Sequence, residues 1–286
     1  MEPESISEVG VVQFRGGAFR EVNDSVAVEE PLEIRLDYTV QGKREQRSLS
    51  ITMRTPGEDF DLVRGFLYTE GIIQHASQIK ALHLCGRPAP GTTLRNTVRV
   101  TLAPEVELDF KRLERHFYTT SSCGVCGKTS LEALRQTSYP PIAGVTLKIS
   151  PQWIASLPVR LREAQSVFDR TGGLHASALF DTTGELICLR EDVGRHNALD
   201  KLIGVCFEQG RLPLSEHVLL LSGRVSFELM QKALMAGIPI VVAVGAPSSL
   251  AVEMAREFGI TLLGFTREDR FNIYSGSERI DSSSTL

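Results

Sequence analysis

The sequence predicts an α/β protein, α+β overall, with a smaller α+β domain over residues 11–138 and a more regular domain over residues 139–276. The length of 286 residues favours about two domains. Strand patterns dominate the first half, whereas short apolar strands alternate with helical patterns in the second. That alternation is typical of a partly parallel sheet covered on both faces. The serine-rich residues 277–286 predict a flexible tail.

Composition places the chain among ordinary folded proteins and narrows its partners. Hydrophobic residues make up 42% and charged residues 23%, while a net charge of −4 offers no bulk attraction to nucleic acid or an anionic membrane. We expect a cytoplasmic protein, since no apolar run approaches roughly 18 residues and the start lacks a signal-peptide layout. The five cysteines do not form a disulfide framework. Apolar surroundings predict that Cys85, Cys188 and Cys206 are buried.

In the first half, period-two alternation predicts strands and turn residues separate them. The predicted strands are residues 11–19, 32–40, 48–53, 79–85 and 96–102, with helices at 60–67 and 108–117. Thr55-Pro56-Gly57-Glu58 predicts a capping box at the start of the first of these helices, and Gly71 predicts its end.

The second half predicts strands that alternate with helices. A helix over residues 150–168 should end or kink at Pro158, because proline disrupts a helix interior. A hairpin of residues 175–180 and 185–190 follows, with later strands at 218–221, 238–244, 260–265 and 271–274. Helices are predicted between them at 198–208, 225–236 and 250–258.

The pair of thiols in Cys123-Gly124-Val125-Cys126 is the strongest chemical signal. The pair precedes Thr129-x-x-Glu132, a capping-box pattern that predicts the start of a helix. A helix N-terminus is electropositive and favours the thiolate, so these cysteines are candidate nucleophiles. Two inert packed thiols, or half of a zinc site, remain as alternatives for a C-x-x-C motif.

Polar residues follow three predicted strands of the second half at their carboxyl ends, where α/β sheets bind ligands. The predicted nucleotide-like anion site uses helix starts, arginines and carboxylates that can accept from the N1–H and amino group of guanine. Phe265 or Phe227 could stack on the base. Ordinary helix caps and surface ion pairs are the alternative. The candidate residues are Ser222, Gly223, Arg224 and Phe227, the segment 245–249, and Phe265, Thr266, Arg267, Glu268, Asp269 and Arg270.

Two histidines flank these loops. His175 is expected to be a structural hydrogen bonder. His196 lies between acidic and basic residues in the segment 191–197 at a predicted helix start, so it is expected to orient a ligand or to carry a proton.

Taken together, these motifs resemble those of the formate dehydrogenase accessory sulfurtransferase family, FdhD. The resemblance spans about residues 24–274 and includes the thiol pair, Gly172-Gly173-Leu174-His175-Ala176, the run from Glu191 to Lys201, and Leu221-Ser222-Gly223-Arg224. It implies a second half with a three-layer, cytidine-deaminase-like fold.

The family resemblance also implies an activity. A cysteine desulfurase would supply persulfide sulfur, with Cys123 as its acceptor and Cys126 as partner. The recipient would be molybdenum bis(molybdopterin guanine dinucleotide), bound as substrate at Phe265 to Arg270 and needed by formate dehydrogenase. No permanent metal is expected.

Two alternative functions remain open at the level of sequence. A zinc deaminase needs H-x-E and P-C-x-x-C, but Ser177 follows His175-Ala176 in place of the glutamate, so deamination is unexpected. A structural zinc at Cys123, Cys126 and His175 is not excluded. A non-catalytic cofactor chaperone could use the thiols only as a redox latch. The oligomeric state is left open, with a homodimer among the expectations.

Overall fold

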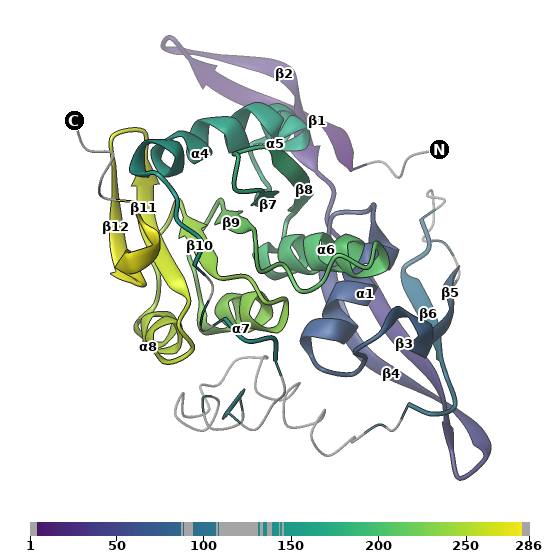
Figure 1. Ribbon diagram of the computed structural model, residues 1–286. Coiled ribbons are helices and arrows are strands. Elements are labelled where there is room, and N and C mark those ends of the chain that lie inside the picture. Colours follow the sequence, from purple (N-terminus) through teal and green to yellow (C-terminus); the bar gives the residue numbers. More distant parts are fainter. Residues whose placement is uncertain are drawn as a thin grey trace.

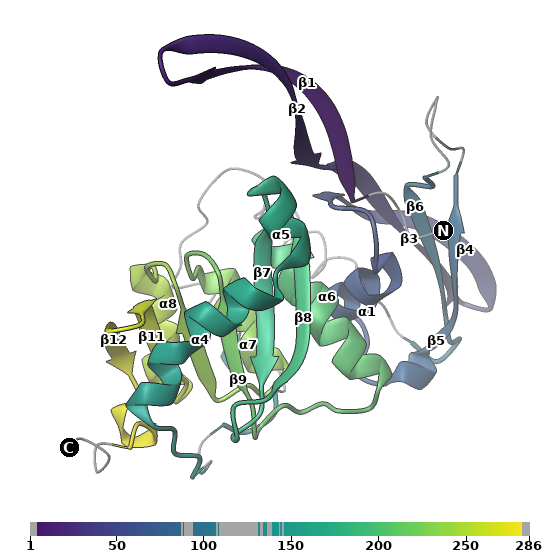
Figure 2. The same ribbon diagram turned by 90° about the horizontal axis from the view of Figure 1, so that it is seen from above.

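A computed structural model describes residues 5–86, 88, 94–106, 108, 131, 134–135, 139–142, 144 and 146–281. Within these residues the strands form three sheets, of two, four and six strands (Figure 1). The two-stranded sheet is an arm that projects from the rest of the molecule, as Figure 2 shows. None of the described helices is long and apolar enough to cross a membrane.

The arm consists of β1 (Ile6–Arg15) and β2 (Ala18–Ala27), joined by a two-residue turn. Gly16 and Gly17 have φ angles of 61° and 82°, which this kind of turn requires and glycine adopts without strain. The prediction of a single strand over residues 11–19 is therefore wrong. Its alternating pattern runs through the turn, because the two glycines reverse the chain without interrupting the spacing of apolar residues.

The four-stranded sheet has the order β4-β3-β6-β5. Its strands are β3 (Glu30–Val40), β4 (Lys43–Arg54), β5 (Ile79–Cys85) and β6 (Thr97–Leu102), with η1 (Ala76–Gln78) before β5. Helix α1 (Asp59–Thr69) covers one face, where Leu32, Ile34 and Leu36 are fully buried at every second position of β3. The period-two pattern that predicted this strand is thus the pattern of its buried face.

The six-stranded sheet has the order β12-β11-β10-β9-β7-β8. Its strands are β7 (His175–Phe180), β8 (Leu186–Asp192), β9 (Val218–Leu221), β10 (Ile240–Ala243), β11 (Thr261–Arg267) and β12 (Arg270–Ser275). Strands β9, β10 and β11 are parallel, whereas β7, β8 and β12 run antiparallel to their neighbours. A final 3₁₀ turn, η2 (Ser277–Arg279), follows β12.

Helices cover both faces of this sheet (Figure 2). On one side lies α4 (Pro151–Ala164), followed by α5 (Ser166–Thr171); on the other lie α6 (Arg195–Glu208), α7 (Phe227–Met235) and α8 (Ser249–Glu257). Leu219 packs toward α6, α7 and α8, whereas Leu220 packs toward α4, so both faces of β9 are apolar. The three-layer α/β prediction and the order β-β-α-β-α-β-α-β are confirmed.

Helices α1 and α6 join the two larger sheets and cross where each has a glycine. A Cβ on Gly65 would overlap the backbone carbonyl of Asp200, and a Cβ on Gly204 would overlap that of Asp61. Only glycine permits so close an approach of the two backbones. This crossing fixes the four-stranded sheet to the helix layer of the larger sheet.

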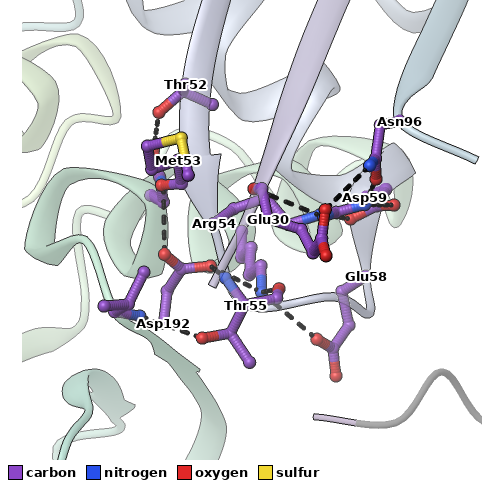
Figure 3. Close-up of polar contacts among 12 residues, drawn as sticks. Glu30, Thr52, Met53, Arg54, Thr55, Glu58, Asp59, Asn96 and Asp192 are labelled. Carbon is purple, nitrogen blue, oxygen red and sulfur yellow. Dashed lines mark hydrogen bonds and ion pairs between the residues drawn. The ribbon is translucent and has the colours of Figure 1, made fainter. Parts of the chain in front are cut away.

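A cluster of buried polar side chains around Asp192, Asn197 and Lys201, which we call the joint, adds to this contact (Figure 3). The carboxylate of Asp192, at the end of β8, accepts the backbone N–H of Thr55 at 3.1 Å and pairs with the ammonium of Lys201 at 2.9 Å. Lys201 also donates to the carbonyl of Thr55, and Asn197 donates to that of Met53. Because these groups are buried, each depends on the others for its hydrogen bonds.

Two expectations about helix ends are wrong. Thr55 does not cap α1: the helix begins at Asp59 after the left-handed residue Glu58, and the Thr55 hydroxyl instead accepts the backbone N–H of Val193 at 3.2 Å. Pro158 neither ends nor breaks α4, which continues to Ala164. The break before α5 falls instead at Gln165, whose backbone is no longer helical.

The structure also tests the expectations about which cysteines are buried and whether the tail is flexible. Cys206 is buried as predicted, but Cys85 and Cys188 are partly exposed. Within the predicted flexible tail, Ser277 and Glu278 are exposed, but Arg279 and Ile280 are buried and Ile280 forms a β-bridge with Ile149. The domain boundary at residue 138 stays a prediction.

Candidate functional site

The carboxyl ends of β9, β10 and β11 lie side by side, as the sequence predicts for its candidate loops. Backbone hydrogen bonds join the loops laterally: Gly245 N–H donates to the carbonyl of Gly223, and Phe265 N–H donates to that of Gly245, each at 3.0 Å. The Ser248 N–H donates to the carbonyl of Val225 at 2.9 Å. The three segments therefore form one continuous edge, which we call the strand edge, defined by residues 222–226, 245–249 and 265–270.

Two glycines make this close association of the loops feasible. A Cβ on Gly245 would lie 2.7 Å from the carbonyl carbon of Gly223, and a Cβ on Gly264 would lie 2.9 Å from Cδ of Pro247. Neither distance occurs between real side-chain and backbone atoms without displacement. These glycines allow backbone N–H and C=O groups of adjacent loops to meet directly.

The β9 loop is tied to β7 at one end of the strand edge. Ser222 exchanges hydrogen bonds with Ala176: its N–H donates to the carbonyl at 3.0 Å, and its hydroxyl accepts the Ala176 N–H at 2.8 Å. Arg224 is exposed, and α7 begins only at Phe227, with Ser226 as its N-cap. The helix start predicted directly after Ser222 is thus displaced by a few residues.

The β11–β12 turn forms the other end of the strand edge. Phe265 has a left-handed φ of 53° and is 44% exposed, so its ring is accessible at a bulge in β11. Arg267 donates to the carbonyls of Val244 and Thr266, which fixes its guanidinium against the neighbouring loop. The side chain of Thr266 is fully buried, so only its backbone could contact a ligand, and its place in the binding segment stays a prediction. In an extended segment, successive side chains face opposite sides.

The charged side chains of this turn do not form ion pairs with one another. Within the described part of the chain, Arg267, Glu268, Asp269 and Arg270 form no ion pairs, and all of them are exposed. The alternative of paired surface charges therefore finds no support at this turn. Phe227, the other candidate stacking residue, is half-buried and packs against the core at the start of α7.

His196 lies at the start of α6 and faces the β9 loop. Its Nε2 is 3.3 Å from the hydroxyl of Ser226, and Ser226 in turn hydrogen-bonds Glu228. Burial, with the positive charge of Arg195 as the next cause, lowers the pKa of His196 to about 4. The imidazole is therefore neutral near pH 7, where it can donate or accept one hydrogen bond without adding charge.

His175 and Arg195 complete this end of the site. His175 starts β7 next to Gly223, where a Cβ would lie 3.2 Å from the histidine Nδ1. Burial, and then Arg195, lowers the pKa of His175 as well. The Nε of Arg195 is buried and has no hydrogen-bond partner among the described residues. An unpaired guanidinium N–H beside two neutral imidazoles suits an anionic or carbonyl oxygen of a ligand.

The residues of the segment 191–197 lie in two different environments. Asp192 and Asn197 are buried in the joint to the four-stranded sheet, whereas His196 contacts Ser226 and Arg195 lies close enough to His175 and His196 to lower the pKa of both. Ser226 and Glu228 were missed by sequence reasoning, although the first is a recognisable helix N-cap. Their neighbour in space, His196, lies 30 positions away in the sequence, so only the fold reveals the contact.

The strand edge is long enough for an extended ligand. Neighbouring strands lie about 4.8 Å apart, so the strand edge together with the adjoining start of β7 spans roughly 14 Å, over the three steps of the order β11-β10-β9-β7. One end offers neutral imidazoles and arginines, and the other an aromatic ring, arginines and carboxylates. A ligand with separate phosphate and base portions could use both ends.

Cys123 and Cys126 lie outside the described residues. Among the residues that are described, no cluster of His, Cys, Asp and Glu is suited to hold a metal ion. Ser177, which stands where a deaminase has its glutamate, is buried in β7 and cannot carry a proton for a ligand at the strand edge.

The fold and the strand edge define a three-layer α/β protein whose candidate binding site lies at the carboxyl ends of parallel strands. Residues 27–281 match the model of the FdhD/NarQ family. The chain belongs to the FdhD/NarQ family.

Relatives from several organisms support this assignment. The sulfur carrier protein FdhD of Streptomyces avermitilis is 53% identical over 94% of both chains, and that of Mycobacterium tuberculosis 50% identical over 90% of this chain and 92% of its own. The Sulfurisphaera tokodaii protein of the same name is 42% identical over 96% of this chain and 99% of its own. A crystal structure of a protein assigned as a formate dehydrogenase accessory protein, from Desulfotalea psychrophila, aligns with a TM-score of 0.70 at 25% identity, over 96% of this chain and 99% of that one.

Proposed function

We propose that the protein is a sulfurtransferase that carries sulfur on Cys123 to a molybdenum cofactor bound at the strand edge. The sulfur donor is a cysteine desulfurase, and the acceptor is molybdenum bis(molybdopterin guanine dinucleotide), which is cargo rather than a resident cofactor. The sulfurated cargo then passes to formate dehydrogenase in the cytoplasm, where thiols stay reduced. The names of the relatives, sulfur carrier proteins, support the carrier role.

The transfer needs only thiol exchange at the protein. The Cys123 thiolate attacks the terminal sulfur of the donor persulfide, so a sulfur–sulfur bond forms on Cys123 and the desulfurase cysteine leaves as a thiolate. The Cys126 thiolate can then attack Cys123 sulfur, which forms a disulfide and releases hydrosulfide toward the metal. A cellular dithiol reduces the disulfide and resets the carrier.

The strand edge is the observation that carries the cargo assignment. Glu268 and Asp269 are exposed and unpaired within the described region, so they can accept from the N1–H and amino group of a guanine stacked on Phe265. Arg195, Arg224 and Arg267 supply donors for phosphate oxygens. Neutral His196 can orient a polar group of the pterin without electrostatic cost.

Mass spectrometry of the intact protein tests the sulfur-transfer step. After incubation with a cysteine desulfurase and cysteine, the wild-type protein should gain one sulfur that maps to Cys123 and is removed by a reductant. The Cys123→Ala variant should gain none, while a matched Cys85→Ala variant, altered at a partly exposed cysteine of β5, should react as the wild type does. Sulfur on another residue, or on none, would contradict the proposal.

A cellular assay separates sulfur transfer from passive carriage of the cofactor. A strain lacking its own copy of the gene should make active formate dehydrogenase with the wild-type protein and lose at least 90% of that activity, roughly a tenfold effect, with Cys123→Ala. A non-catalytic chaperone would still support the client without this thiol. Full activity with Cys123→Ala would therefore favour the chaperone.

A further inference from the structure

An ion pair lies buried between helices α6 and α7. The ammonium of Lys232 is 2.9 Å from the carboxylate of Asp200, and their side chains are only 8% and 3% exposed. The surrounding faces of both helices are apolar and belong to the core on this side of the six-stranded sheet. A buried ion pair seldom contributes more stability than apolar side chains of similar volume, because both charges lose their hydration. Stability alone therefore does not explain this pair.

The end of helix α1 completes the surroundings of Lys232. The ammonium donates to the hydroxyl of Thr69 at 3.0 Å and to the carboxylate of Glu70 at 3.4 Å, and the Thr69 hydroxyl donates to Asp200 at 3.0 Å. Burial acts against the charge, but Asp200 and Glu70 raise the pKa of Lys232 above its usual value. A lysine ammonium has three N–H groups, and each has an acceptor here. The position of this side chain is therefore fixed by α1 and α6 together.

The same two helices form the contact between His196 and Ser226 in the candidate site. Asp200 follows His196 by four positions on α6. Lys232 follows Glu228, the other partner of Ser226, by four positions on α7. Residues four apart lie on one face of a helix, so the ion pair lies one helical turn beyond the contact. The charge of Lys232 also lowers the pKa of His196, after burial and a neighbouring arginine as larger causes.

The hydrogen bonds of Ser226 show which nitrogen of His196 carries the proton. Burial acts in the opposite direction, but the Ser226 hydroxyl lowers the pKa of Glu228 because it donates to this carboxylate. A hydroxyl has one proton, so the same oxygen accepts from Nε2 of His196, 3.3 Å away. The neutral imidazole therefore has its proton on Nε2, and its Nδ1 can accept from a ligand.

We propose that Lys232 is a positioning residue of the candidate site: it fixes the start of α7 against the start of α6, so that Ser226 holds the Nε2–H of His196 in place. Lys232 acts through these two residues rather than on a ligand. Because Thr69 and Glu70 belong to the smaller unit, the position of α1 also affects the site. The inference rests on the proposed function, in which the strand edge and His196 bind the cargo.

Paired substitutions separate positioning from stability. The double variant Lys232→Met with Asp200→Leu removes both buried charges, and the Thr69 hydroxyl keeps the carbonyl of Phe66 as a partner at 3.3 Å. Its midpoint of urea denaturation should equal or exceed that of the wild type. Lys232→Met alone should lower the midpoint, because the Asp200 carboxylate is then buried without its cation. A double variant much less stable than the wild type would make the pair a structural cross-link and overturn the inference.

Nuclear magnetic resonance of histidine labelled with nitrogen-15 observes the contact directly. The wild type should show a protected Nε2–H proton for His196 at neutral pH, since burial and a hydrogen bond both slow its exchange with water. The double variant and Ser226→Ala should each exchange this proton roughly tenfold faster or more. A matched control, Arg64→Gln with Glu208→Gln, removes a 2.9 Å ion pair that joins α1 to the opposite end of α6 and should keep the signal. Unchanged protection in the double variant overturns the inference.

Activation of formate dehydrogenase in cells tests whether this position matters for function. In a strain lacking its own copy of the gene, the double variant and Ser226→Ala should each lower the activity roughly tenfold or more, since displacing a positioned group by about 1 Å can have such an effect. The control variant should support full activity. Sulfur loading of Cys123 in vitro should match the wild type in every variant, because the ion pair takes no part in that step.

The two assays distinguish failure of this inference from failure of the proposed function. Full client activity with the double variant overturns the inference and leaves the proposed function intact. A wild type that accepts no sulfur contradicts the proposed function, and the exchange of the His196 Nε2–H then still decides whether Lys232 positions the imidazole.

Discussion

The two larger sheets differ in how many of their faces are covered. Helices pack on both faces of the six-stranded sheet, whereas the four-stranded sheet has α1 on one face and exposes Ile51 and Met53 elsewhere on β4. The candidate residues of the strand edge all belong to the doubly covered sheet. The difference indicates that a core covered on two faces positions the site. The smaller sheet contacts this core through the α1–α6 crossing and through the hydrogen bonds of Asp192, Asn197 and Lys201.

The largest expected effect comes from breaking the contact between these two units. Gly204→Ala places a Cβ into the backbone of α1, so either helix must move and the buried groups of the joint lose their partners. We expect the free energy of unfolding to fall by about 3 kcal/mol or more, measured by urea denaturation.

Gly10→Ala on β1 is the matched control, because nothing lies within 4 Å of the added methyl group. Its effect should stay within about 0.5 kcal/mol. Equal stability of the two variants would mean that the smaller sheet does not depend on the α1–α6 crossing.

A second, smaller effect should appear in the pH dependence of stability. The pKa of His196 falls to about 4 in the folded protein, mainly by burial, whereas it is near 6.5 in the unfolded chain. Its stabilising contribution is thus complete above pH 6.5 and is lost as the pH falls toward 4, by up to about 3 kcal/mol.

Urea denaturation at pH 7 and pH 5 measures this loss. His196→Gln should reduce the difference between the two values, whereas His83→Gln, at an exposed position of β5, should leave it unchanged. An identical pH dependence in the wild type and His196→Gln would show that His196 is not buried as a neutral group.

Local patterns predicted most of the sheets and helices, and the failures have physical causes. Strand β3 was predictable because its buried residues alternate, and β9 because its whole length is apolar. Thr55 has the sequence spacing of a capping box. Its hydroxyl and its backbone N–H instead bond Val193 and Asp192, which lie 137 or more positions away in the sequence. No local pattern contains such a partner.

The position of the candidate site was predictable from the sequence, but the packing of its side chains was not. Sequence reasoning located the three loops of the strand edge, because the carboxyl ends of parallel strands must meet. It did not show that Thr266 faces inward or that Arg195 leaves an N–H unpaired, since both depend on packing against other elements.

Calorimetric titration with guanosine diphosphate, compared with adenosine diphosphate, tests the role of the strand edge most directly. The wild type should bind the guanine nucleotide at least tenfold more tightly, a difference of about 1.4 kcal/mol, because only guanine presents two donors to the carboxylates. Glu268→Gln with Asp269→Asn should abolish that preference without loss of stability, whereas Glu278→Gln, on η2, should retain it. Equal affinity of the wild type for both nucleotides would contradict a guanine-binding strand edge.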